Sequence, residues 1–109
     1  MTTPESIEIS IKRNTVNIVS IDVSEFEVVD IRELHEQPRL PQEVCGYECW
    51  PLSEFEDHVD KIDPEKKYLF FCQAGVRTQN LIHQLHRFET TNTFSLEGGV
   101  FAFQHLMDN

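Results

Sequence analysis

The chain has 109 residues, enough for one hydrophobic core, and we expect residues 1–109 to form a single domain. Nineteen acidic residues against nine basic ones give a formal net charge of -10. This charge argues against nucleic acid or an anionic membrane as a partner, because both need a basic surface. It leaves docking on a basic protein open. No apolar run approaches the roughly 18 residues needed to span a bilayer.

The first ten residues contain no basic stretch followed by an apolar one, so the sequence predicts no signal peptide. The chain has three Cys, an odd number. Reduced thiols fit this pattern better than disulfides do, and we therefore expect a cytoplasmic protein.

The first part of the chain predicts two strands and an irregular segment. Met1–Ser6 is expected to be a loose end, and Ile7–Ile11 alternates apolar with polar residues, as half-buried strands do. Asn17–Val23 is apolar and fits a strand or a short helix. Phe26–Ile31 is β-branched and nearly continuous, which is typical of a buried parallel strand. Leu34–Pro41 contains two prolines and is expected to be irregular.

The middle of the chain predicts a short strand and a helix. Val44–Trp50 fits the strand, and Ser53–Val59 fits a helix capped by Ser53, with Glu56 three residues on. Pro64 introduces a turn before the next apolar run.

The stretch with the strongest pattern follows this turn. Tyr68–Phe71 is short, apolar and rich in aromatics, which predicts a buried strand that ends at Cys72. Gln73–Thr78 reads as a loop. Apolar residues then recur at helical spacing, so the loop is expected to lead into an amphipathic helix: Leu81, Ile82, Leu85 and Phe88.

The remaining residues predict a last strand over Thr91–Leu96, a turn at Gly98-Gly99 and a closing helix over Val100–Met107. Strands that alternate with helical patterns indicate an α/β fold. We expect a central parallel sheet of about five strands, with helices on both faces.

Cys72 lies between the carboxyl end of a strand and the amino end of a helix, where α/β folds place their chemistry. Unpaired backbone N–H groups and the helix dipole favour a thiolate there, and Arg77 adds a permanent positive charge. A buried core Cys is the alternative. The pattern favours a nucleophilic cysteine in an anion-binding loop.

Here the sequence resembles a known family. Cys72–Thr78, with four residues between Cys and Arg, is similar to the active-site loop of rhodanese-like sulfurtransferases. Val28–Glu33 resembles an early strand of that family, Pro51–Phe55 resembles a weaker segment, and Leu96–Gly99 followed by Phe101 resembles the late Gly-Gly segment. The resemblance implies the rhodanese fold.

The resemblance also implies the reaction. Cys72 would take a sulfane sulfur from a donor such as thiosulfate, become a persulfide and give the sulfur to a nucleophilic acceptor, without a cofactor. An alternative is a carrier module that passes the persulfide between protein partners in thiamine, molybdopterin or tRNA thiolation. A phosphatase-like reaction ranks lower, because the loops of cysteine phosphatases are one residue longer.

Several roles are expected within the loop. The amides of Gln73, Ala74, Gly75, Val76 and Arg77 would stabilise the charge of the terminal sulfur. Gly75 is expected to have a positive φ, and Thr78 either caps the helix or places its hydroxyl near the sulfur. Arg77 binds an anionic donor, pairs with an acidic neighbour, or does both.

Three residues outside the loop are candidates for lining a pocket. Asp30 and Arg32 end a strand on the same sheet edge as Cys72, and the resemblance implies a mainly structural role for both. Glu97 precedes the Gly-Gly turn and either lines the pocket or is solvated. Phe101 and Phe103 are core residues or the rim of a shallow pocket.

Cys45 and Cys49 allow three interpretations. With His35 and His58 nearby in sequence they suggest zinc, but no second ligand pair accompanies them, and no metal site is expected. One of them could instead resolve a Cys72 persulfide. Apolar packing is the default. Around them the chain departs from the family pattern, with Gly46 alone retained, which leaves the pocket wall and the substrate open.

Overall fold

The computed structural model describes residues 14–40 and 46–103, which form a five-stranded parallel sheet in the order β1-β5-β4-β2-β3. The strands are β1 (Thr15–Val16), β2 (Glu27–Asp30), β3 (Glu48–Cys49), β4 (Tyr68–Phe71) and β5 (Thr93–Leu96). The parallel α/β sheet is thereby confirmed.

Both faces of the central strand β4 are covered, and its residues alternate between two cores. Tyr68, Phe70 and Cys72 belong to one core, and Leu69 and Phe71 belong to the other. The continuous apolar run is therefore explained, because both faces of β4 are covered.

Helix α3 (Val76–Arg87) covers the first face through Leu81, Ile82 and Leu85, as its apolar spacing predicts. The same core takes in Phe55 of the 3₁₀ helix η3 (Leu52–Asp57), which is followed by η4 (Val59–Lys61). The expected α-helix capped by Ser53 is wrong. Pro51 precedes a tighter 3₁₀ helix, and Ser53 uses its hydroxyl to contact Glu33 instead.

The second face is covered by three further 3₁₀ helices, η1 (Ile18–Ser20), η2 (Val23–Glu25) and η5 (Gly99–Phe103). Asn17–Val23 is thus mainly 3₁₀ turn, and the two-residue edge strand β1 just before it was not predicted. The segment over 34–40 is irregular, as expected. Ile7–Ile11, Cys45 and residues 104–107, where the closing helix was expected to end, lie outside the described residues.

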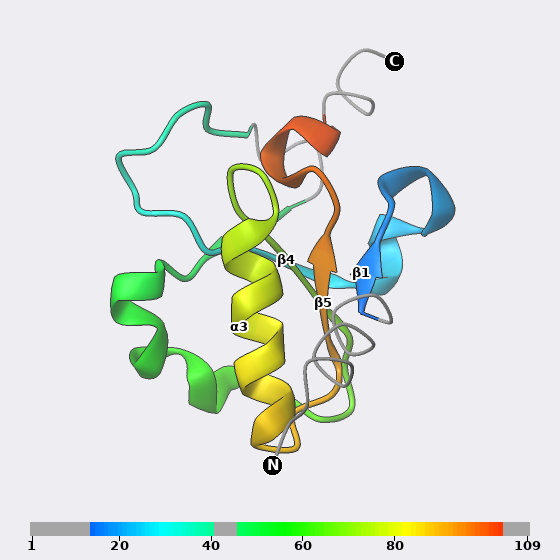
Figure 1. The fold of residues 1–109 in the computed structure, drawn as a ribbon, viewed down its shortest axis with the longest axis vertical. Coiled ribbons are helices and arrows are strands. Elements are labelled where there is room, and N and C mark those ends of the chain that lie inside the picture. Colours follow the sequence, from blue (N-terminus) through cyan, green and yellow to red (C-terminus); the bar gives the residue numbers. More distant parts are fainter. Residues whose placement is uncertain (1–13, 41–45, 104–109) are drawn as a thin grey trace.

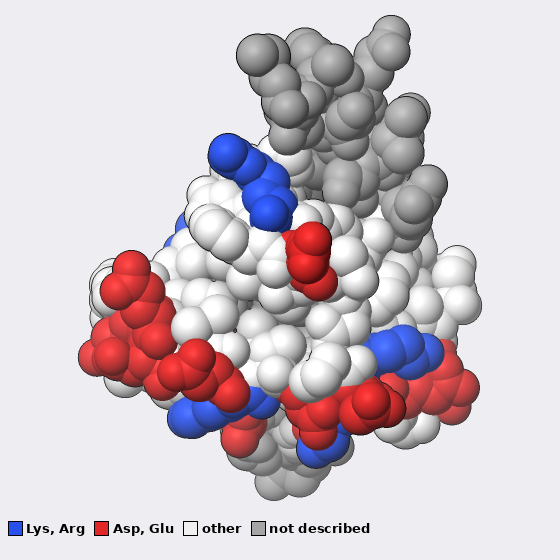
Figure 2. All heavy atoms as spheres, turned by 90° about the horizontal axis from the view of Figure 1, so that it is seen from below, with Lys and Arg blue, Asp and Glu red and all other residues white. Residues whose placement is uncertain are grey.

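The two ends of the sheet differ in chemistry. The Cys72 loop lies at the carboxyl ends of the strands, next to η5 (Figure 1). Figure 2 shows the opposite end, where Asp and Glu side chains form several groups with a few Lys and Arg between them. None of the helices in the described residues has the length and apolar character that a bilayer-spanning segment requires.

Candidate active site

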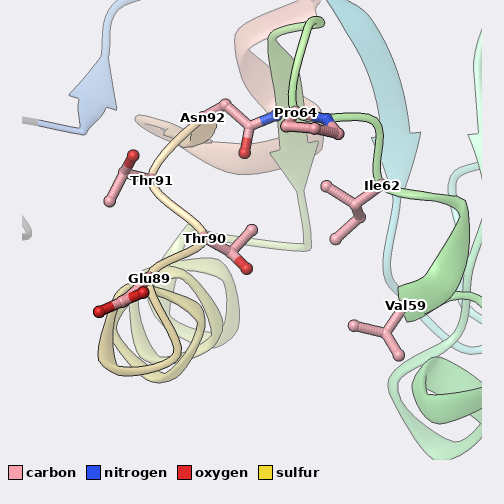
Figure 3. A pocket seen from close by; sticks show the side chains of 7 residues that line it. All are labelled: Val59, Ile62, Pro64, Glu89, Thr90, Thr91 and Asn92. Atoms are coloured by element: carbon pink, nitrogen blue, oxygen red, sulfur yellow. The ribbon is translucent and has the colours of Figure 1, made fainter.

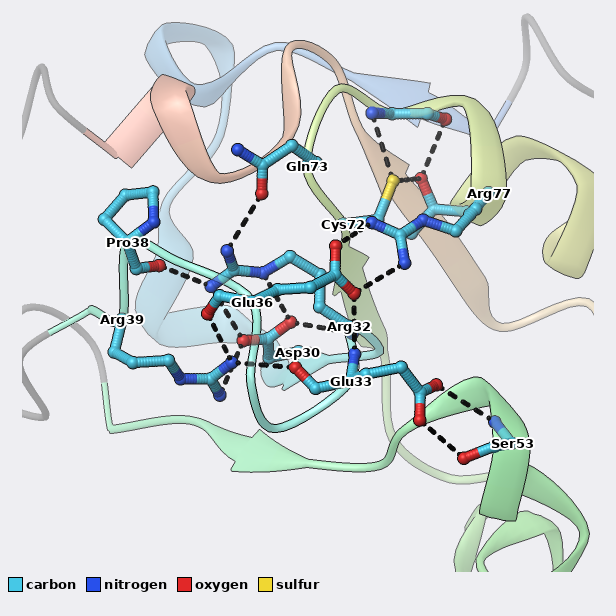
Figure 4. A network of polar contacts seen from close by, with 12 residues as sticks. Asp30, Arg32, Glu33, Glu36, Pro38, Arg39, Ser53, Cys72, Gln73 and Arg77 are labelled. Carbon is cyan, nitrogen blue, oxygen red and sulfur yellow. Dashed lines mark hydrogen bonds and ion pairs between the residues drawn. The ribbon is translucent and has the colours of Figure 1, made fainter.

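Cys72 is the first residue after β4 and is almost completely buried, with 1% of its surface exposed. Its Sγ accepts a hydrogen bond from the Gly75 N–H at 3.1 Å (Figure 4). Gly75 adopts the predicted left-handed conformation, with φ of 100°, which turns this amide back toward the sulfur. A sulfur that receives a backbone N–H can hold negative charge at this position.

Thr78 is not the helix cap. Gly75 is the capping residue, so Thr78 stands in the first turn of α3, fully buried. Its hydroxyl donates to the Gly75 carbonyl at 2.9 Å and lies 2.6 Å from the Ser95 hydroxyl and 3.7 Å from the Cys72 sulfur. The second expectation for this residue, a hydroxyl close to the sulfur, matches this geometry. Thr78 holds the turn of the loop in place.

Arg77 forms a two-point ion pair with Glu36, from the segment after β2. The two guanidinium nitrogens Nη1 and Nη2 donate to the carboxylate at 2.8 Å and 2.7 Å (Figure 4). These hydrogen bonds lower the pKa of Glu36 to about 2 and raise the pKa of Arg77, to which the neighbouring Cys72 thiol adds a smaller effect. The expectation that Arg77 pairs with an acidic neighbour is confirmed.

Asp30 and Arg32 form a buried ion pair that is hydrogen-bonded to the Cys72 loop through Gln73. Both side chains are fully buried, with Oδ2 of Asp30 3.1 Å from Nη2 of Arg32. The guanidinium also donates to Oε1 of Gln73 at 3.0 Å and to the Pro38 carbonyl at 2.7 Å. Arg39 adds a second cation, 3.0 Å from Asp30. Asp30 and Arg32 therefore position the loop and do not contact the thiol in these hydrogen bonds.

Sequence reasoning missed the residues that organise this network after Arg32. The Glu33 carboxylate accepts hydrogen bonds from the hydroxyl and the N–H of Ser53, and these lower the pKa of Glu33. The backbone N–H of Glu33 donates to the Glu36 carboxylate at 2.8 Å. Arg39 donates to the backbone carbonyls of Glu33 and Glu36. One available signal was the position of Glu36, a few residues beyond a strand that ends at the same sheet edge as Cys72.

The remaining predicted residues fall at the edge of this arrangement. Ala74 and Val76 are exposed, whereas Gln73 is half-buried. Glu97 is exposed, and its carboxylate accepts a hydrogen bond from Asn17 at 3.1 Å, so it is solvated and directed toward the start of η1.

Comparisons with known proteins agree with this fold, although no family model matches the chain. Over 82 residues it is 29% identical to a Bacillus subtilis protein named Putative sulfurtransferase YtwF, covering 73% of this chain and 75% of that protein. The structure superposes on a rhodanese-related protein from Thermoplasma volcanium with a TM-score of 0.67 and 21% identity, covering 84% of this chain and 91% of the other. The chain has the rhodanese-like fold.

A second solved structure extends the likeness. An NAD-dependent persulfide reductase from A. fulgidus matches with a TM-score of 0.66 and 22% identity. The match covers 90% of this chain and 18% of the reductase, so the rhodanese-like domain corresponds to one part of that protein. The likenesses together support the rhodanese-like sulfurtransferase family.

Cys49 of the rhodanese-like domain is half-buried in β3, and its sulfur accepts a hydrogen bond from Arg39 at 3.2 Å. It packs against the second core, in line with the default interpretation. Among the described residues no three His, Cys, Asp or Glu side chains gather as a metal site. Cys45 lies outside those residues, so all three interpretations of Cys45 stay untested.

Two hollows mark the surface of the described part of the domain. The smaller, of about 150 Å³, adjoins the loop and is lined by Leu52, Arg77, Asn80, Leu81 and Gln84. The larger, of about 330 Å³, lies at the amino ends of β4 and β5, opposite Cys72 (Figure 3). The lining of this larger hollow holds no Cys or His. The candidate site is therefore identified by the Cys72 thiol and its hydrogen bond with Gly75, and not by the size of a hollow.

Exposed apolar side chains lie on three segments that form or contact the loop or its ion pair. Val76 is 64% exposed at the start of α3, and Phe101 is 53% exposed in η5, next to the residue whose N–H binds the Cys72 carbonyl. Leu34 is 66% exposed, two residues beyond Arg32. Phe103, in contrast, is a fully buried core residue. These segments therefore present apolar side chains at the surface near the loop.

Proposed function

We propose that the domain transfers sulfane sulfur through a persulfide on Cys72. The observation that carries this proposal is the position of Sγ, at the end of β4 and 3.1 Å from the Gly75 N–H that opens α3. An amide at the start of a twelve-residue helix stabilises negative charge on the sulfur, first as a thiolate and then on the outer sulfur of a persulfide.

The transfer takes two displacements. The Cys72 thiolate attacks the outer sulfur of the donor, an S–S bond forms to Sγ, and the donor's own S–S bond breaks with its electron pair. With thiosulfate the leaving group is sulfite. A nucleophilic acceptor then attacks the outer sulfur, and Cys72 leaves as the thiolate.

Loop length supports sulfur over phosphate as the transferred group. Four residues separate Cys72 from Arg77, which makes a tighter ring than the phosphatase loop. One of the amides inside this ring, that of Gly75, already points at Sγ. A single sulfur atom needs less space and fewer donors than a tetrahedral phosphate.

A persulfide carrier served by protein partners is the second candidate. The exposed Leu34, Val76 and Phe101 favour it, because apolar side chains around a nucleophile suit a protein surface better than a small dianion. The likeness to one part of a persulfide reductase supports a role in which the sulfur stays on proteins.

Thiocyanate formation from cyanide tests the proposal. We expect the native domain to produce it from thiosulfate, or from a cysteine desulfurase supplied with cysteine, and Cys72→Ala to produce none. Cys49→Ala is the matched control, since its thiol lies outside the loop. Thiocyanate formed with the desulfurase but not with thiosulfate would identify the domain as a persulfide carrier. No thiocyanate from either donor, or hydrolysis of an aryl phosphate instead, would contradict sulfur transfer.

A further inference from the structure

We infer that Glu36 sets the class of sulfur donor, by occupying Arg77 so that the site favours an alkyl persulfide, R–S–SH, over the dianion thiosulfate. The inference rests on the proposed function and concerns the first of its two displacements.

The ion pair has the geometry of a lasting contact. Both terminal nitrogens of Arg77 donate to Glu36, and the Glu33 N–H donates to the same carboxylate at 2.8 Å. With the pKa of Glu36 lowered to about 2, this carboxylate is ionised at any physiological pH. An incoming oxyanion must therefore compete with a bound carboxylate for the guanidinium.

The other cations of the network are also engaged. Arg32 and Arg39 both bind Asp30, at 3.1 Å and 3.0 Å, and Arg32 is fully buried. Counting Glu33, the network holds three carboxylates and three guanidiniums. It offers no surplus positive charge to a dianionic donor, and the chain as a whole carries -10.

An alkyl persulfide does not need a free guanidinium or surplus positive charge at the site. Its outer sulfur is the atom that meets the Gly75 N–H and Cys72, and its carbon stem can lie on the apolar side chains of Val76 and Phe101. The Cys72 thiolate attacks that outer sulfur, which keeps its proton, and the R–S⁻ thiolate leaves with the electron pair of the broken S–S bond. The charge is the same before and after the step.

The test compares two donors on one set of variants. Loading of Cys72 is measured as kcat/KM with thiosulfate and with cysteine persulfide, cyanide being the acceptor. We expect the native domain to prefer the persulfide, and Glu36→Gln to raise the ratio of thiosulfate to persulfide about tenfold, mainly through a lower KM for thiosulfate. Tenfold is the size expected when one hydrogen bond to a charged group is gained.

Three variants separate this effect from simple loss of charge or of folding. Glu27→Gln removes a surface charge that pairs with Lys66 outside this network, and leaves the ratio unchanged. Glu36→Asp keeps the carboxylate and retains most of the native preference for the persulfide over thiosulfate. Glu36→Gln combined with Arg77→Met loses the gain, because Glu36 acts through Arg77.

Each remaining outcome overturns the inference. Equal native efficiency with both donors, or the same ratio in Glu36→Gln and Glu27→Gln, rejects the role of Glu36 while sulfur transfer stands. A gain that persists without Arg77 rejects the mechanism. No loading from either donor rejects the proposed function along with it. A desulfurase persulfide, run as a third donor, shows whether R is a protein or a small thiol.

Discussion

Gly99 packs against Cys72 so closely that a methyl group on its α-carbon would lie 2.5 Å from the Cys72 carbonyl oxygen and would also overlap that of Gln73. The next residue, Val100, donates its N–H to the same Cys72 carbonyl at 2.7 Å. The Gly-Gly turn thus packs against the backbone of the Cys72 loop, which explains why two motifs distant in sequence lie together in the fold.

Gly99→Ala is expected to destabilise the domain by roughly 2–4 kcal/mol, since the left-handed φ of 64° and the overlap with backbone atoms add together. Urea denaturation measures the loss. Gly46→Ala is the matched control, with φ of 58° and no atom within 4 Å of the added methyl, and should cost only about 1 kcal/mol. Equal losses in the two variants would show that the close approach is unimportant.

Arg32→Ala is expected to cost about 3 kcal/mol, because it leaves the buried Asp30 with Arg39 as its remaining cation. Lys66→Ala, from an exposed pair with Glu27 at 3.8 Å, should cost less than about 1 kcal/mol. Denaturation curves of both variants give the comparison. A small loss for Arg32→Ala would mean that the pair does not support the fold.

Thr78→Val is expected to slow loading of Cys72 and to destabilise the domain by about 1–3 kcal/mol, since the Gly75 carbonyl and the Ser95 hydroxyl lose a buried partner. Thr78→Ser keeps the hydroxyl and should behave like the native chain in both respects. The loading rate and the thermal midpoint are measured together. A native loading rate in Thr78→Val would show that loading of Cys72 does not need the Thr78 hydroxyl.

The Glu36–Arg77 pair predicts a pH dependence of stability. The pKa of Glu36 falls from an ordinary 4.5 to about 2 on folding, mainly through its hydrogen bonds with Arg77. A lowered pKa stabilises the fold fully above pH 4.5, and the contribution is lost as the pH falls toward 2. Between these values Glu36→Gln should lose stability less steeply than the native chain in urea denaturation. Glu97→Gln, an exposed control, should follow the native curve; identical curves for all three would contradict the assignment.

The sequence predicted the parts of the fold that depend on local pattern. Continuous apolar runs identified β2 and β4, helical spacing identified α3, and small residues identified the turn at Gly75. These signals are strong because the burial of each element follows directly from its own residues.

Tertiary contacts decided the rest. Ser53 and Thr78 are both good capping residues by type, yet their hydroxyls bind Glu33 and the Gly75 carbonyl, because those partners come within reach only after folding. The sequence marked Glu36 only by its place a few residues beyond β2, since its role comes from Arg77, 41 residues away along the chain. A single sequence does not show which of the acidic residues near that sheet edge pairs with Arg77.

The most direct test of a Cys72 persulfide is the intact mass of the domain after incubation with a sulfane donor, thiosulfate in one sample and cysteine persulfide in another, followed by cyanide. Cys72→Ala, which retains Cys45 and Cys49, is measured in parallel. We predict that the native domain gains the mass of one sulfur atom, that cyanide removes it, and that Cys72→Ala shows no such gain. No gain with either donor, or an equal gain in Cys72→Ala, would contradict the persulfide.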